Sequence, residues 1–316
     1  MVNGGRCPVF RLPSVMRLSN HERPYAHYLV VGSVNIQLKT TQAILEVTMP
    51  AGFLNDIAPF IDETLGLRIG KSPRYRNKTN YLKLSEASAR NFDARRVIER
   101  IYATIESCRL TTIYCKAPSK HNWDLIPRRR TSADRDKLEV TLERDIVDLE
   151  GASWSAQVPT SSGLWDHKQA KRSAIDLIHK CGDDSYEFIE LKIESGTPLF
   201  AAMEILVYGI LYIYSRIYAE PLGYKVEEKP LLKAEQIHLK ILAPEGYYAN
   251  CNLDWLERKI TRGLSDFLRA CQCHHFQMDL KFEAFPKWFF EVKKPYPSNN
   301  EIREALRTRH VVYPRH

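Results

Sequence analysis

The sequence predicts a mixed α/β protein, and three observations carry that prediction. Short segments alternate apolar and polar residues with the period of a β-strand, and longer segments carry apolar stripes with the period of a helix. Within the C-terminal part, these segments follow the order α-β-β-β-α-β-α-β. The chain of 316 residues is also long enough for two domains. We therefore expect a mixed sheet flanked by helices, preceded by a smaller α+β domain.

Residues 1–125 are predicted to form the smaller α+β domain, and their role is not evident from the sequence. Segments rich in β-branched residues predict strands, and segments with helical spacing predict helices, the first of them broken at Pro59. The predicted strands cover residues 28–34 and 42–49, and the predicted helices cover 53–65 and 92–108.

A basic stretch with interleaved aromatic residues, 68–83, stands between these two helices. It contains Arg74, Tyr75, Arg76 and Tyr81. Such a loop either follows a phosphate backbone and stacks on bases or is simply a solvated surface loop. The sequence leaves both interpretations open, with Arg74 and Arg76 as the candidate nucleic-acid contacts.

Residues 117–132 contain prolines, polar residues and three consecutive arginines, which are typical of a linker. The predicted main domain therefore covers residues 126–290, and a basic tail with one short helix covers 291–316. The elements of the main domain are predicted as helix 133–149, strands 153–160, 173–180 and 186–193, helix 199–219, strand 236–242, helix 253–270 and strand 276–285. Thr197 and Pro198 are suited to the N-cap and the first position of the long helix.

Two of the predicted strands carry charges where core strands normally carry none. Asp176 lies in the middle of 173–180, and Glu190 and Lys192 lie on 186–193. The intervening CGDD segment is suited to a hairpin turn. Because side chains alternate along a strand, Glu190 and Lys192 share one face with Phe188. Pairing about the turn would bring Asp176 to the level of Glu190.

Two carboxylates and an ammonium group at one place suggest phosphate chemistry. Mg²⁺ or Mn²⁺ binds carboxylate oxygens, so Asp176 and Glu190 are the candidate metal ligands, with the backbone carbonyl of Leu191 as a third. A metal held there would activate a water for attack on a phosphate. Lys192 would orient that water or offset the developing charge. The alternative is a solvated sheet face on which these carboxylates simply pair with lysines.

Asp176 followed by Glu190-Leu191-Lys192 resembles the signature of the PD-(D/E)XK nuclease superfamily. The resemblance covers residues 133–285, and Ile175 stands where the motif name has proline. It implies a restriction-endonuclease-like fold, metal-dependent hydrolysis of phosphodiesters, DNA as the more common substrate, and roles in defence or repair. It also implies that the helix 133–149 donates a glutamate, for which we choose Glu143, and that the enzyme often works as a homodimer.

Other residues near this motif are candidates for substrate contacts. Lys168, Lys171 and Arg172 precede the strand of Asp176 and are candidate phosphate contacts. Glu204, the charge inside the long helix, points either to the site or to solvent. Two further classes of function stay open: a nucleic-acid-binding domain that does not cut, and an interaction subunit that docks a protein partner through residues 1–125.

The composition favours a polyanion partner and a soluble, cytoplasmic protein. The net charge is +8 and the pI about 9.0. The longest apolar run, 205–214, is too short to cross a bilayer, so no membrane partner is expected. The seven cysteines show no disulfide-like pattern. Cys271, Cys273, His274 and His275 match no common zinc spacing, and we expect a helix end and a strand start there.

Overall fold

The computed structural model describes residues 30–31, 34–35, 53–67, 74–81, 84, 86–111, 118–125, 138–162, 174–193, 196–249, 252–290 and 296–313. The chain divides into two compact units, residues 1–45 and 46–316. In the first unit, β1 (Val30–Val31) and β2 (Val34–Asn35) pair in antiparallel fashion, where one strand over 28–34 was predicted. The predicted strand 42–49 lies outside the described residues.

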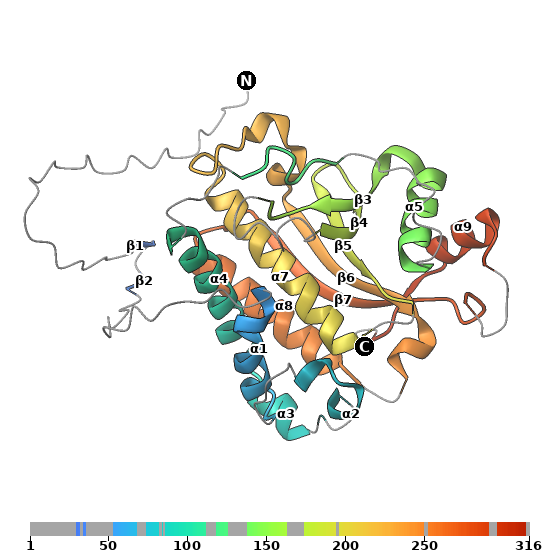
Figure 1. Ribbon diagram of the computed structural model, residues 1–316, viewed down its shortest axis with the longest axis horizontal. Helices are drawn as coiled ribbons and strands as arrows, with labels where there is room; N and C mark the ends of the chain where they lie inside the picture. Colours follow the sequence, from blue (N-terminus) through green and yellow to red (C-terminus); the bar gives the residue numbers. More distant parts are fainter. Residues whose placement is uncertain are drawn as a thin grey trace, which may run out of the picture. The chain divides into compact units, whose positions relative to one another are not determined.

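The described strands of the second unit form a six-stranded mixed sheet whose spatial order follows the sequence (Figure 1). The strands β3, β4 and β5 are antiparallel, β5, β6 and β7 are parallel, and β8 is antiparallel to β7. Their bounds are β3 Trp154–Pro159, β4 Ala174–Lys180, β5 Ser185–Leu191, β6 Gln236–Pro244, β7 Gln277–Phe285 and β8 His310–Val311. The mixed sheet and the predicted order of elements are confirmed.

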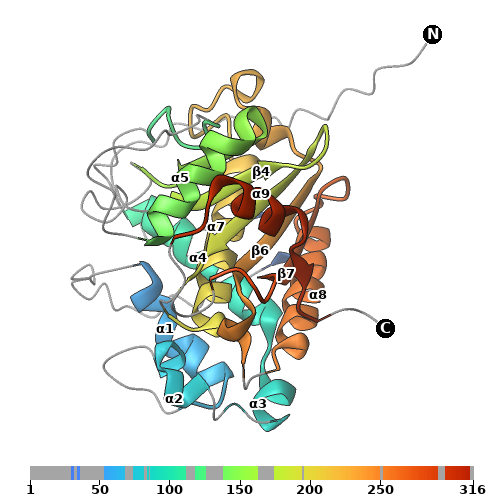
Figure 2. The same ribbon diagram turned by 90° about the vertical axis from the view of Figure 1, so that its right-hand side faces the viewer.

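Helices cover both faces of this sheet. On one face lie α4 (Ala94–Thr111), α7 (Pro198–Ile217) and α8 (Asp254–Ala270), and on the other α5 (Leu138–Glu150) and α9 (Asn299–Arg307) (Figures 1 and 2). The strands alternate accordingly: Phe188 packs in the α7 core, whereas Ile189 and Leu191 pack in the α5 core. The sequence predicted this alternation, and it directs Glu190 toward the α7 face.

The helix α7 has the cap that the sequence predicted. The Thr197 side chain accepts a hydrogen bond from the Phe200 N–H, and Pro198 occupies the first turn. Among the described helices, α7 alone is long and apolar enough to cross a bilayer, but 89% of its apolar window is buried in this protein. Burial on nearly all sides explains its apolar composition.

The helices of residues 53–111 are not a separate domain. Tyr102 of α4 lies 5.6 Å from the Tyr214 ring of α7 and 5.2 Å from the Phe267 ring of α8. The helix α1 (Phe53–Thr64) also runs through Pro59 without the predicted break, because Ile57 and Ile61 on its buried face hold it to the core. The remaining helical segments are α2 Lys78–Tyr81, α3 Glu86–Asn91, η1 Arg74–Arg76, η3 Gly151–Ser153, η4 Val226–Glu228, η5 Pro230–Lys233 and η6 Glu245–Tyr248.

Part of the predicted linker is packed rather than exposed. Trp123 is fully buried and lies 6.3 Å from the Phe188 ring of β5. Asp124 accepts a hydrogen bond from Lys229 Nζ at 2.6 Å. The boundary after residue 125 therefore does not separate two compact units, because the segment on its N-terminal side is part of the main core.

The predicted C-terminal tail is also part of the fold. Ser298 and Glu301 form a capping box that starts α9. Beyond α9, Ala284 of β7 pairs with His310, which makes β8 the last strand of the sheet. Long-range strand pairing, which a two-residue segment does not reveal in sequence, explains this difference.

Candidate functional site

The β4–β5 hairpin places its charged residues as the sequence predicted. Leu177 stands opposite Ile189, so the same register brings Asp176 to the level of Glu190. At this end of the hairpin, the Leu191 N–H donates to Asp176 Oδ2 at 3.0 Å. The Leu191 backbone and the Asp176 carboxylate are therefore in direct contact.

Lys192 connects β5 to the helix α7 through contacts with a carboxylate on each. Its ammonium group donates a hydrogen bond to Glu190 Oε1 and lies 3.5 Å from Glu204 Oε2 of α7. Glu190 is 2% exposed. Glu204 Oε2 is buried and accepts no hydrogen bond within the described part of the protein. Of the two directions left open for Glu204, the structure selects the one toward the hairpin.

Gln157 of β3 connects two further carboxylates. Its Nε2 donates to Glu143 Oε2 of α5 at 2.6 Å and to Asp176 Oδ1 at 3.4 Å. Its neighbours Ala156 and Val158 pair with Leu177 and Ile175 on either side of Asp176, and Gln157 itself has a φ of +52°, a left-handed conformation that is rare in a strand. Glu143 is 2% exposed. We call Asp176, Glu190, Glu143, Glu204 and Lys192 the acidic cluster.

The carboxylates of the acidic cluster are held in an environment that disfavours their charge. Burial, together with the negative charges of neighbouring carboxylates, raises the pKa of Asp176 to about 6 and that of Glu143 to about 9. The same causes raise the pKa of Glu190 well above its ordinary value, although Lys192 opposes them. The single ammonium group does not balance the carboxylates around it.

Lys192 itself stays charged. Burial lowers its pKa, but the carboxylates of Glu190, Glu204 and Asp176 outweigh that effect and raise the pKa above the ordinary value for lysine. A cation fixed among carboxylates can orient a phosphate oxygen or a water. It cannot act as a general base at neutral pH, because it does not release its proton.

The remaining predicted site residues are not part of the cluster. Lys168, Lys171 and Arg172 lie outside the described residues. Arg74 and Arg76 lie in η1, with exposed side chains. Cys271 and Cys273 lie between the end of α8 and the start of β7, as expected, and burial raises the pKa of both thiols.

Gln157 and Tyr247 have no signal in the sequence that marks them as site residues. In the sequence, Gln157 is an ordinary polar position on the predicted strand 153–160. Tyr247, in η6, has a hydroxyl that is buried without a hydrogen-bond partner in the described structure. Burial raises the pKa of this hydroxyl, and the charges of Lys192 and Glu190 also act on it. Only the tertiary structure brings β3 and η6 to the hairpin.

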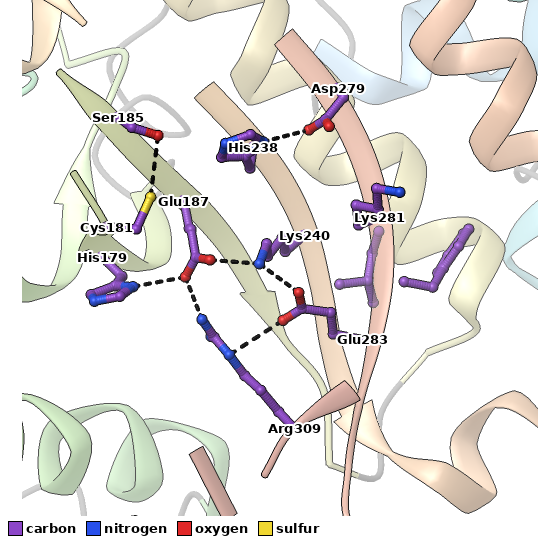
Figure 3. A network of polar contacts seen from close by, with 12 residues as sticks. His179, Cys181, Ser185, Glu187, His238, Lys240, Asp279, Lys281, Glu283 and Arg309 are labelled. Carbon is purple, nitrogen blue, oxygen red and sulfur yellow. Dashed lines mark hydrogen bonds and ion pairs between the residues drawn. The ribbon is translucent and has the colours of Figure 1, made fainter. Parts of the chain in front are cut away.

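A second charged network lies on the opposite face of the sheet (Figure 3). Lys240 of β6 bonds both Glu187 of β5 and Glu283 of β7 at 2.5 Å. Arg309, next to β8, donates to Glu187 Oε2 at 2.6 Å, and His179 of β4 lies 2.8 Å from the same oxygen. We call these five residues the ion network.

The ion network balances its charges. Burial alone would raise the pKa of Glu187, but the hydrogen bond from His179 and the charges of Arg309 and Lys240 outweigh it and lower that pKa well below its usual range. A network that stabilises its own charges needs no further cation. It also connects the start of β8 to the four inner strands β4, β5, β6 and β7, which is a structural role.

Within the described residues, no group of three or more His, Cys, Asp or Glu side chains is arranged closely enough to hold a metal ion as it stands. Comparisons with protein-family models, with curated proteins and with solved structures gave no match. The geometry and electrostatics of the acidic cluster are therefore the basis for a functional argument.

Proposed function

We propose that this protein is a metal-dependent nuclease with a restriction-endonuclease-like fold, and that the acidic cluster is its active site. One observation carries the proposal: Asp176, Glu190 and Lys192 meet at the end of one hairpin, with Glu143 and Glu204 beside them. The order of elements around the hairpin, α5-β3-β4-β5-α7-β6-α8-β7, supports the fold assignment. The resemblance of the D…E-L-K residues to the superfamily signature supports it independently.

The donor set suits a hard divalent cation such as Mg²⁺ or Mn²⁺. Asp176, Glu190 and Glu143 would hold the ion, with the Leu191 carbonyl as a further oxygen ligand. A cation would offset the mutual repulsion that raises the pKa values of these carboxylates. When bound, such an ion polarises a phosphate and lowers the pKa of a water. Binding would require the carboxylate oxygens to converge, because within the described residues they do not yet form a group close enough to hold an ion.

Each residue of the chain then has a defined task. Lys192 would place its positive charge beside the phosphate and stabilise the negative charge that develops on it. Gln157 would hold Glu143 and Asp176 in a fixed relative orientation through its amide group. Glu204 would keep Lys192 directed along α7.

The alternative of a solvated face with ordinary ion pairs agrees less well with the geometry. Glu190 and Glu143 are each only 2% exposed, and their pKa values are raised. Surface ion pairs normally lower a carboxylate pKa. Clusters of buried groups with strongly perturbed pKa values are typical of functional sites.

The substrate in this proposal is DNA rather than RNA, with a homodimer as the working form and defence or repair as the biological setting. These three parts rest on the resemblance alone. The net charge of +8 supports a nucleic-acid partner of either kind.

The deciding experiment compares the wild type with Lys192→Ala on circular duplex, linear duplex and single-stranded DNA and on RNA, each with Mg²⁺, Mn²⁺ or EDTA. Lys225→Ala, which removes a 74% exposed lysine, serves as the control. We expect metal-dependent cleavage by the wild type and the control, reduced about 100- to 1,000-fold by Lys192→Ala. Absence of cleavage by the folded wild type under every condition would contradict the proposal and favour a domain that binds without cutting.

A further inference from the structure

A basic turn lies beside the acidic cluster at the start of α7. The guanidinium carbon of Arg76 in η1 lies 4.0 Å from the centre of the Phe200 ring. Phe200 and Glu204 are four residues apart on α7, so they share a helix face and are separated by about 6 Å along the axis. Glu204 in turn contacts Lys192. Arg76 is thus one helical turn away from the cluster.

Contacts from the core hold this turn in place. The buried carboxylate of Asp62 in α1 accepts hydrogen bonds from the Arg74 N–H at 2.8 Å and the Tyr75 N–H at 2.9 Å. The Tyr75 ring is fully buried and stacks on Phe200 at 6.0 Å. The backbone from which Arg76 extends is therefore preorganised.

The positive charges of this turn are available to a partner. Arg74, Arg76 and Lys78 are exposed, and none of them forms an ion pair with a carboxylate in the described portion of the chain. The aromatic residues of the same stretch are not available, because Tyr75 is 0% and Tyr81 3% exposed and Arg76 covers Phe200. Bases cannot stack on buried rings, which excludes these rings as the stacking platform that the sequence left open.

We propose that Arg76, assisted by Arg74 and Lys78, binds backbone phosphates of the nucleic-acid strand next to the phosphate at the acidic cluster, without reading bases. This inference rests on the proposed function and specifies how the substrate is held. A charged contact of this kind gives affinity that depends on salt and not on sequence.

The test measures the affinity of labelled oligonucleotides of two unrelated sequences at several NaCl concentrations, once in EDTA and once in Ca²⁺. It compares the wild type with Arg76→Ala, Arg76→Lys and Arg262→Ala. The last variant removes an 87% exposed arginine from α8 and serves as the matched control. Thermal unfolding of each variant checks that it is folded.

We expect Arg76→Ala to reduce the magnitude of the slope of log affinity against log salt concentration by about 0.7 to 0.9. It should also weaken the affinity for both oligonucleotides by the same factor. Arg76→Lys should keep the slope. An Arg76→Ala protein that binds like the wild type or like Arg262→Ala would overturn the inference, as would a wild type that binds neither oligonucleotide. Loss that differs between the two sequences would overturn the claim of backbone recognition.

The outcome for this surface is separable from the outcome for the active site. Binding is measured without cleavage, and cleavage with Mg²⁺ is a separate measurement. Binding that depends on Arg76, together with no cleavage, would support the phosphate-binding role of Arg76 and contradict the proposed nuclease activity. Cleavage that Lys192→Ala abolishes, together with unchanged binding by Arg76→Ala, would support the nuclease activity and contradict the phosphate-binding role of Arg76.

Discussion

The two faces of the central sheet bury charge in opposite ways. On the α7 face, Asp176, Glu190 and Glu204 meet one lysine, Glu143 of α5 joins Asp176 through Gln157, and the pKa values of Asp176, Glu190 and Glu143 rise. On the α5 face, Glu187 and Glu283 meet Lys240, Arg309 and His179, and the pKa of Glu187 falls. Both groups include residues of β4 and β5, so the difference comes from the partners that other elements bring.

The proposed function assigns binding to the acidic cluster, and the balanced charges of the ion network assign stability to that network. Buried like charges cost free energy unless a counter-ion compensates them, and proteins retain such costs mainly at functional sites. A balanced ion network is costly only when one partner is removed. Substitutions in the acidic cluster should therefore affect function, and substitutions in the ion network should affect folding.

The largest expected difference is in cleavage. Asp176→Asn removes a charge from the acidic cluster and should reduce metal-dependent cleavage about 100-fold or more. Glu187→Gln, a matched change on the neighbouring strand, should leave the cleavage rate of the folded protein within about twofold. Initial rates at a temperature well below unfolding test both. Equal losses in the two variants would remove the functional distinction between the clusters.

The reverse difference is expected in stability. Glu187→Gln leaves Lys240 and Arg309 without their shared carboxylate and should lower the free energy of unfolding by about 3 to 5 kcal/mol. Asp176→Asn should leave it unchanged or raise it, because it relieves repulsion. Chemical denaturation of both variants in EDTA measures these values. A stable Glu187→Gln protein would contradict the structural role of the ion network.

Mg²⁺ should stabilise the wild type by about 2.7 kcal/mol at a concentration 100 times its dissociation constant. The same stabilisation is expected in Glu187→Gln, which keeps the acidic cluster, and little in Asp176→Asn. Thermal unfolding over a range of Mg²⁺ concentrations provides the comparison. If all three proteins respond equally, the ion binds elsewhere.

The two clusters should also respond to pH with opposite sign. Glu143 binds its proton more tightly in the folded state, so it contributes stability below pH 4.5 that is lost as the pH rises toward about 9. For the same reason, Asp176 contributes stability below pH 3.8 that is lost as the pH rises toward about 6. Glu187 has a lowered pKa, so it contributes stability above pH 4.5 that is lost as the pH falls below it. Denaturation of the metal-free protein across pH 3 to 9 should therefore show both declines.

Single substitutions should show which carboxyl group causes each loss of stability. Glu143→Gln should reduce the loss of stability between pH 4.5 and about 9. Glu187→Gln should reduce the loss of stability at acidic pH. An unchanged alkaline slope in Glu143→Gln would show that this carboxyl group is not perturbed by burial.

The smallest effect concerns the backbone of β3. Gln157 has a φ of +52°, which glycine adopts without strain, so Gln157→Gly should be more stable than Gln157→Ala by about 1 kcal/mol. Both variants lose the amide that bridges Glu143 and Asp176, and both should cleave more slowly than the wild type. Equal stability of the two variants would indicate that the left-handed conformation is not retained.

Local pattern was sufficient to predict much of the fold. The strand alternation of residues 186–193 placed Glu190 and Lys192 on one face, and the turn at residues 181–184 set a register that brings Asp176 to Glu190. Both properties depend on side-chain period and turn chemistry, which are readable in a few neighbouring residues. The long helices and their order were predictable for the same reason.

Local pattern failed where distant segments decide the outcome. Trp123 looked like part of a linker, yet it packs on Phe188, and His310 looked like part of a tail, yet it pairs with Ala284. Pro59 predicted a helix break, but burial of the flanking isoleucines keeps α1 continuous. In each case, contacts far apart in the sequence outweigh the local preference.

For the candidate site, the sequence by itself determined the hairpin and the three charged residues on it, because alternation and a tight turn fix their positions relative to one another. The resemblance suggested Glu143 as a neighbour and the sequence left the direction of Glu204 open, but only the tertiary structure decided what surrounds the three residues. Gln157, Glu143 and Glu204 come from three other elements, and the packing of those elements sets the burial and the excess of negative charge. Such electrostatics depend on distances through space, and those distances follow from the packed core rather than from the order of residues.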